Sequence, residues 1–134
     1  MIGIVDYGAG NLRSVQKAIE HVGHPAVITR DPEWVAVAPA VLFPGQGASP
    51  PAMAALRATG MDQALRQAIR RGTPFFGVCL GLQLLFSWTE EGGGECLDIL
   101  PGRVVRFPAR AKVPPMGWNP VQQKAAPPLF RGVP

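Results

Sequence analysis

The residue best suited to covalent chemistry is Cys79, in the run Gly77-Val78-Cys79-Leu80-Gly81. Apolar residues precede and follow this run, so Cys79 stands between a predicted strand and a predicted helix. A nucleophile flanked by glycines at such a turn is typical of the nucleophile elbow, in which the side chain projects above the edge of a sheet. The start of the helix favours the thiolate, and the Leu80 N–H would stabilise an oxyanion. The pattern predicts attack on a carbonyl; the alternative is a buried structural cysteine.

A second loop is predicted to open at the same edge of the sheet. Pro44-Gly45-Gln46-Gly47 follows a predicted strand at 40–43, so it can bring a second backbone N–H to an oxyanion at Cys79. An ordinary turn is the alternative. The first loop, Gly8-Ala9-Gly10, lacks the third glycine of a dinucleotide fingerprint, because Arg13 stands there, and nucleotide binding is therefore rejected.

A general base for Cys79 is harder to find. The chain has only two histidines, His21 and His24, at and just past the end of the first predicted helix. A helix of about 12 residues is roughly 18 Å long and runs back from the strands' carboxyl edge. Both histidines are therefore expected at the opposite edge, far from Cys79, as surface residues.

The elements that position these residues alternate between strand and helix. Asn11 can cap the first helix, whose apolar residues fall on one face. Strands alternating with helices predict a parallel sheet with helices on both faces, the α/β class. The predicted strands are 2–6, 26–29, 40–43 and 75–78. Helices are predicted at 11–22 and 80–88, and helical material follows the loop 44–51, with an apolar stripe at 61–69. Beyond residue 90 the pattern weakens, with possible short strands at 104–107 and 119–122.

Composition limits the other possibilities. A chain of 134 residues with 47% hydrophobic residues has the size and composition of one domain, spanning 1–134. The net charge of +4 comes from scattered basic residues, so nucleic-acid binding is not expected. No apolar run reaches the roughly 18 residues needed to span a bilayer, and no leader precedes the first strand. We expect a cytoplasmic protein in which Cys79 and Cys96 are free thiols.

Three segments together resemble one family. The opening Ile4-Val5-Asp6-Tyr7-Gly8-Ala9-Gly10-Asn11-Leu12-Arg13-Ser14-Val15 is similar to the start of the glutaminase subunits of imidazole glycerol phosphate synthases. Gly77-Val78-Cys79-Leu80-Gly81-Leu82-Gln83 resembles the elbow of class I glutamine amidotransferases, to which those subunits belong. Val113-Pro114-Pro115-Met116-Gly117-Trp118-Asn119 resembles a further signature of the same subunits. The resemblance covers the whole chain and implies a flavodoxin-like sheet with its C-terminal part missing.

The resemblance implies an enzyme that hydrolyses glutamine to glutamate and ammonia. In the family, the ammonia passes to a partner cyclase, a (β/α)8 barrel, which makes imidazole glycerol phosphate in histidine biosynthesis. Carried over by position, Cys79 is the nucleophile, and Leu80, Gln46 and Gly47 belong to the oxyanion and substrate loop. Gln83 contacts glutamine. Asn11 and Trp118 lie near the interface with the cyclase. No cofactor or metal is implied.

The chain departs from the family pattern at three points. Pro115 stands where the family commonly has His, and Ser49 where it commonly has an aromatic residue, which suggests altered local contacts. The family's catalytic His and Glu lie in a His-Pro-Glu motif beyond residue 134. Two alternatives stay open: a partner-binding fragment without the chemistry, inactive alone, and a thiol hydrolase with the same elbow and another substrate.

Overall fold

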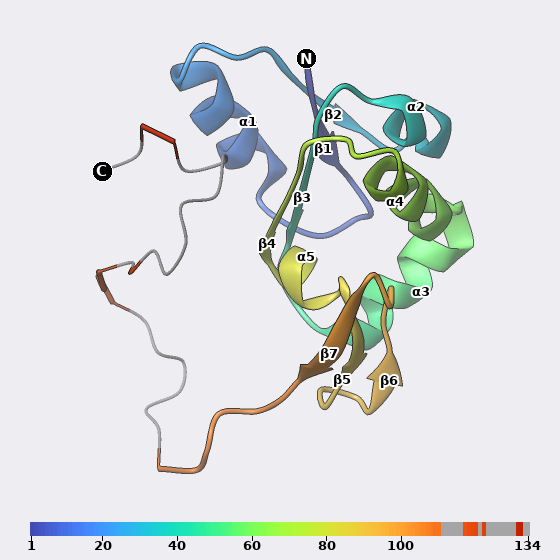
Figure 1. The fold of residues 1–134 in the computed structure, drawn as a ribbon, viewed down its shortest axis with the longest axis vertical. Helices are drawn as coiled ribbons and strands as arrows, with labels where there is room; N and C mark the ends of the chain where they lie inside the picture. The colour runs from blue at the N-terminus through green and yellow to red at the C-terminus, as the bar shows by residue number, and fades with distance from the viewer. Residues whose placement is uncertain (111–116, 121, 123–130, 133–134) are drawn as a thin grey trace.

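A four-stranded parallel sheet forms the centre of the molecule in the computed structural model, which describes residues 1–110, 117–120, 122 and 131–132. The strand order is β2-β1-β3-β4. Helix α1 covers one face of the sheet, and α2 and α4 pack on the other (Figure 1). The predicted parallel α/β architecture is therefore confirmed.

The first βαβ unit follows the sequence prediction closely. Strand β1, Ile2–Val5, is followed by α1, Leu12–His21, and by β2, Ala26–Thr29, which pairs with β1 in parallel. The side chain of Asn11 caps α1, because its Oδ1 accepts a hydrogen bond from the Ser14 N–H at 3.3 Å. This is the cap expected from the residue type.

The second half of the sheet encloses the main core. Strand β3, Val41–Gly45, pairs with β1 on one side and with β4, Phe75–Cys79, on the other. The chain between β3 and β4 forms α3, Ser49–Thr59, and α4, Met61–Arg70. The core here consists of fully buried apolar side chains from these elements, among them Phe43, Leu56, Met61 and Leu65.

One helix was missed by the sequence analysis. Helix α2, Pro32–Val37, lies between β2 and β3 and packs against α4. Asp31 caps it, accepting from the N–H groups of Glu33 at 2.9 Å and Trp34 at 3.3 Å. An Asp followed by Pro at the first helical position is a recognised helix start, so this signal was present in the sequence.

The predicted helix at 80–88 is wrong beyond its first turn. Helix α5 is only Leu80–Gln83, and the chain then turns into β5, Phe86–Thr89. Aromatic residues and threonine favour strands, and here they form one strand of a second, small sheet. The positive end of a helix dipole that Cys79 faces is therefore that of a single helical turn, whereas the sequence predicted a longer helix.

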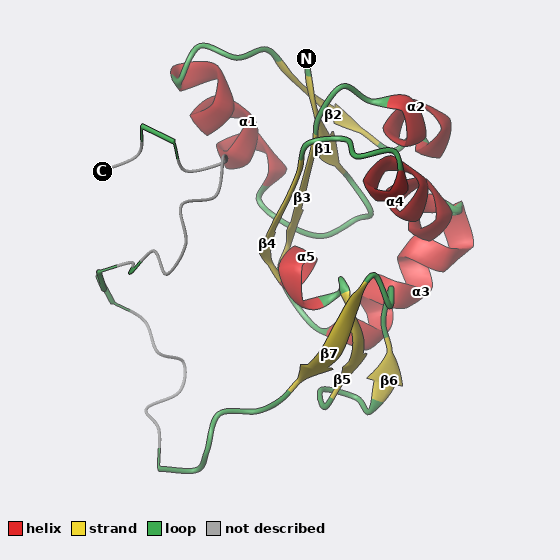
Figure 2. Cartoon of the chain, in the orientation of Figure 1, coloured by secondary structure: helices red, strands yellow, loops and turns green. Residues whose placement is uncertain are grey.

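The small sheet has the order β6-β5-β7 and lies beyond the carboxyl edge of the main sheet (Figure 2). Strand β6, Gly94–Glu95, is antiparallel to β5, and β7, Leu100–Val104, is parallel to it. The predicted strand at 104–107 is thus displaced toward the N-terminus. For 119–122, residues 119, 120 and 122 are not in a strand, and Val121 and Pro115 lie outside the described residues.

Strand β4 is the last strand of the main sheet, as far as the described residues extend. Apolar side chains of β4 and α5 are partly exposed beside this edge, namely Phe76, Val78 and Leu82. Within the described part of the chain, no helix is long and apolar enough to cross a membrane.

Candidate active site

The predicted elbow forms where β4 meets α5. Cys79 is the last residue of β4, with φ of 55° and ψ of −120°, and its side chain is exposed. A non-glycine residue with positive φ is uncommon and marks a strained turn that the surrounding structure must hold. The thiol is thus presented at the carboxyl edge of the sheet, where the sequence analysis expected it.

The elbow is held by close packing against β3. A Cβ added at Gly81 would overlap the carbonyl of Phe43, whose carbon would lie 2.8 Å away. A Cβ at Gly45 would meet the hydroxyl of Tyr7 and come within 3.0 Å of the Gly81 nitrogen. Glycine at 81, in α5, is therefore required by the close approach of β3, whereas the unusual φ is carried by Cys79 itself.

The second predicted loop runs beside the elbow. Strand β3 ends at Gly45, which pairs with Cys79 in the parallel register. The loop then passes through Gln46 and Gly47 to the start of α3 at Ser49. Gly47 lines the same cleft as Cys79, whereas Gln46 is exposed and is not among the residues that line it.

A cleft of about 710 Å³ lies over the thiol. It brings together four of the predicted site residues, Cys79, Leu80, Gly47 and Gln83. The opposite wall comes from the small sheet and the chain after it, which the sequence analysis did not include: Thr89, Glu90, Glu91, Val104, Val105, Arg106 and Phe107. A thiol, a backbone loop and a side-chain amide facing one cleft suit acyl transfer from a small polar substrate.

Two adjacent glutamates hold this opposite wall in place. The carboxylate of Glu90 accepts a hydrogen bond from the Arg106 N–H at 2.7 Å, which fixes the chain that follows β7. The carboxylate of Glu91 accepts from both the N–H and the hydroxyl of Ser49, at 2.9 and 3.0 Å. Ser49, predicted only to alter local contacts, is thus tied to the wall of the cleft.

Tyr7 lies buried beneath the loop. Its ring packs edge-on against Phe43, with ring centroids 5.6 Å apart. Its hydroxyl finds no hydrogen-bond partner among the described residues. Burial, and to a lesser extent the negative charge of a Cys79 thiolate, raise the pKa of Tyr7 to about 12. The phenol therefore stays neutral throughout the physiological range.

The first loop is held by Asp6. Its carboxylate accepts from the Gly8 N–H at 2.9 Å and from Nε of Arg30 at 2.7 Å. Burial works to raise the pKa of Asp6, but the hydrogen bonds from Arg30 and Gly8, with the charge of Arg30, outweigh it and lower that pKa. Asp6 is therefore ionised and fixes the turn after β1.

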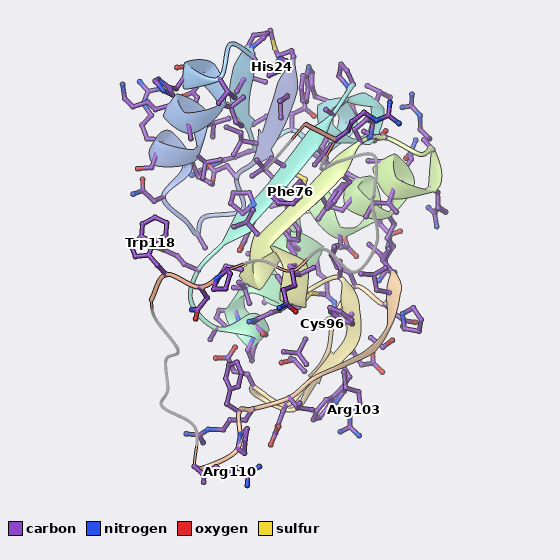
Figure 3. The ribbon with its side chains drawn as sticks, turned by 60° about the vertical axis from the view of Figure 1, so that its left-hand side comes forward. His24, Phe76, Cys96, Arg103, Arg110 and Trp118 are labelled. Atoms are coloured by element: carbon purple, nitrogen blue, oxygen red, sulfur yellow. The ribbon has the colours of Figure 1, made fainter. Side chains whose placement is uncertain are left out.

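The two histidines lie at the far edge of the sheet. His21 ends α1, and His24 comes just before β2, at the edge where the parallel strands begin. Figure 3 shows His24 at the opposite end of the ribbon from Cys96, which directly follows β6, and from Arg103 of β7. Neither histidine lines the cleft, in agreement with the sequence analysis.

The remaining predicted residues lie outside the cleft. Asn11 is exposed, and its side chain caps α1. Trp118 is fully exposed. The second cysteine, Cys96, is buried at the small sheet, and burial raises the pKa of its thiol despite the opposing charge of Arg57. Only one of the two thiols faces solvent.

Comparison with known proteins gives a consistent result. A family model described as "Glutamine amidotransferase class-I" matches residues 3–134. An imidazole glycerol phosphate synthase subunit HisH from Moorella thermoacetica is 53% identical, over 99% of this chain and 64% of that protein. A protein of the same name from Dehalococcoides mccartyi is 47% identical, over 100% of this chain and 66% of that protein. The chain thus spans slightly less than two thirds of the length of these relatives.

The fold comparison agrees with the sequence comparison. A crystal structure of a glutamine amidotransferase superposes with a TM-score of 0.69, covering 84% of this chain and 59% of that chain. The identity is 24%, so this likeness concerns the fold.

Proposed function

Because the chain belongs to the class I glutamine amidotransferase family, we propose that it carries the nucleophile of a glutaminase that converts glutamine to glutamate and ammonia. The observation that supports this most directly is the Cys79 elbow facing a cleft that also contains Gly47 and Gln83. The two relatives named HisH make imidazole glycerol phosphate synthase the expected setting.

The proposed reaction follows from the groups in the cleft. The Cys79 thiolate attacks the side-chain carboxamide carbon of glutamine, and the carbonyl oxygen becomes an oxyanion facing the N–H of Leu80 and the loop at Gln46 and Gly47. The C–N bond then breaks, the nitrogen takes a proton and leaves as ammonia, and a thioester remains. Water attacks the thioester, which releases glutamate and the thiol. Gln83 helps to hold the substrate.

The partner in this proposal is a cyclase subunit that consumes the ammonia and makes imidazole glycerol phosphate in histidine biosynthesis. One glutaminase subunit would pair with one cyclase, with Asn11 and Trp118 near the interface. A cytoplasmic location goes with this proposal, since free thiols such as Cys79 and Cys96 are kept reduced there.

The general base is proposed to come from outside residues 1–134. Both histidines lie at the far edge of the sheet, and proton transfer to the departing nitrogen needs a group within hydrogen-bond reach. We therefore expect the 134-residue chain to bind its partner without turning over glutamine. The position of both histidines at the far edge of the sheet is also the observation that favours the second candidate, a partner-binding unit without chemistry of its own.

The test measures glutamate release from glutamine, coupled to glutamate dehydrogenase, with the cyclase present. A full-length protein, in which the family's C-terminal His and Glu are present, should turn over glutamine, and Cys79→Ser should abolish this turnover. The 134-residue chain should be slower by a factor on the order of thousands, the usual effect of losing the base of a nucleophile–base pair. Turnover by the short chain near the full-length rate would contradict the proposed origin of the base. A Cys79→Ser variant that remains active would contradict the proposed nucleophile.

A further inference from the structure

Ser49 and Glu91 are 42 residues apart in the sequence, yet two hydrogen bonds join them beside the cleft. The N–H and the hydroxyl of Ser49 both donate to Oε2 of Glu91, at 2.9 and 3.0 Å. Ser49 is 1% exposed, so its polar groups have lost water and depend on this carboxylate. The proposed reaction assigns no role to either residue.

The contact supplies what the start of α3 lacks. The first N–H groups of a helix have no partner within the helix, and a side chain at the preceding residue normally satisfies one of them. Here that residue is Ala48, which makes no side-chain cap. The carboxylate of Glu91 accepts the first N–H instead, and a negative charge is favourable at this end of a helix. A remote turn thus performs the capping.

Glu91 is in turn held by its own surroundings. Its N–H donates to the hydroxyl oxygen of Thr89 at 3.2 Å, and Thr89 is buried at the end of β5. The same turn rests on the start of α3, because a Cβ at Gly92 would overlap the ring of Pro50. The turn between β5 and β6 is therefore packed against α3 as well as hydrogen-bonded to it.

These contacts fix the second end of the loop that faces Cys79. The first end, Gly45, is fixed by pairing with Cys79 and by packing against Gly81. The second end is Ser49. We propose that Glu91, acting through Ser49, sets the position of the Gln46–Gly47 peptide relative to Cys79, so that Ser49 and Glu91 are positioning residues for the oxyanion. This inference rests on the proposed glutaminase function.

The kinetic test uses the full-length gene product bound to the cyclase. Ser49→Ala should lower kcat about tenfold and leave KM for glutamine within twofold, because the loop matters most when charge develops on the oxyanion. The rate at which iodoacetamide alkylates Cys79 should stay within twofold of the wild-type rate, since displacement of iodide forms no oxyanion. Glu91→Ala should lower kcat at least as far, and the double variant should lower it no further than Glu91→Ala alone.

Ser87→Ala provides the matched control, because Ser87 lies in the same small sheet and its hydroxyl, among the described residues, donates a single long hydrogen bond, to the Leu100 carbonyl at 3.4 Å. It should change neither kcat nor KM. Hydrogen exchange supplies a readout independent of activity. Amides 46–49 should exchange at least fivefold faster in Ser49→Ala and at the wild-type rate in Ser87→Ala.

The outcomes separate cleanly. The inference is overturned if Ser49→Ala keeps kcat within twofold of the wild type, or if only KM changes. It is also overturned if the separate effects of Ser49→Ala and Glu91→Ala on kcat multiply in the double variant. Exchange of amides 46–49 at the wild-type rate in Ser49→Ala would overturn it as well. A folded wild-type complex that hydrolyses no glutamine contradicts the proposed function instead. In that case the exchange rates of amides 46–49 still decide whether Glu91 fixes the loop.

Discussion

The two thiols differ in the properties that control cysteine reactivity. Cys79 is exposed at the elbow, whereas Cys96 is 3% exposed and burial raises its pKa. Because the thiolate is the reactive form, limiting iodoacetamide at pH 7.5 should modify Cys79 at least about tenfold faster than Cys96. Peptide mapping measures the ratio. Cys96→Ala should keep the fast reaction and Cys79→Ser should remove it; faster labelling of Cys96 in folded protein would contradict the assignment.

Tyr7 makes stability depend on alkaline pH. Its pKa is raised from 10.0 to about 12, so below pH 10 its contribution is fully present, and it is lost as the pH rises from 10 through 12. The loss amounts to about 2 to 3 kcal/mol. Urea unfolding between pH 8.5 and 11.5 should show most of this decline in the wild type.

The Tyr7→Phe variant isolates this effect. It should remove that part of the alkaline decline, and at pH 8.5 it should be at least as stable as the wild type, because the lost hydroxyl has no partner among the described residues. An identical alkaline decline in the two proteins would show that Tyr7 is not its source.

At this scale the sequence was informative about local chemistry and silent about distant contacts. Cys79, Leu80, Gly47 and Gln83 were all predicted, and all line the cleft. Glu91 was not predicted, because its role depends on Ser49, which only the packing of the small sheet brings within hydrogen-bond distance. Two adjacent glutamates before a glycine run look like an ordinary solvated turn in sequence.

At the scale of elements, the packing of α5 against β3 allows a sharp test. In Gly81→Ala the new methyl group would overlap the Phe43 carbonyl, and overpacking of this kind typically costs about 1 to 3 kcal/mol, occasionally more. We expect a loss at the upper end of that range in the free energy of unfolding, because the obstacle is backbone.

Gly94→Ala is the matched control for this substitution. Gly94 lies in β6, and a Cβ there would meet no atom within 4 Å. The free energy of unfolding should change by less than about 0.5 kcal/mol, as for other surface substitutions. Equal losses for the two alanine variants in urea titrations would contradict the packing argument.

The sequence predicted elements best where capping and periodicity agreed. Helix α1 has a polar cap and a single apolar face, and its predicted extent was correct to within a residue at each end. The segment 80–88 is apolar nearly all round, so periodicity could not distinguish a helix from a helical turn followed by a strand. The aromatic residues and threonine of β5 favoured the strand, and pairing with β7 settled it.

At the scale of the whole molecule, Trp118 is the best test of partner binding. Its side chain is fully exposed in the free chain, and large aromatic residues often dominate interface energies. Trp118→Ala should weaken binding to the cyclase by about 2 kcal/mol, or roughly 30-fold in Kd, and leave the unfolding free energy unchanged. Titration calorimetry measures the Kd of the cyclase complex for the wild type and for Trp118→Ala.

Val22→Ala provides the comparison for Trp118→Ala. Val22 is another exposed apolar residue, but it lies past the end of α1, at the far edge of the sheet. Its substitution should leave Kd unchanged. Equal affinity of the wild type and Trp118→Ala would remove Trp118 from the interface.

Among the described residues β4 is the last strand of the main sheet, and this position bears on the behaviour of the 134-residue chain in concentrated solution. Strand β4, Phe75–Cys79, carries no charged residue, and its side chains Phe76 and Val78 are partly exposed. Exposed apolar edge strands are templates for pairing with another copy, and proteins commonly protect them with lysine. The 134-residue chain should therefore self-associate as its concentration rises, and Phe76→Lys should suppress this in sedimentation velocity. Equal sedimentation of the two proteins at every concentration would show that the chain does not self-associate through the β4 edge.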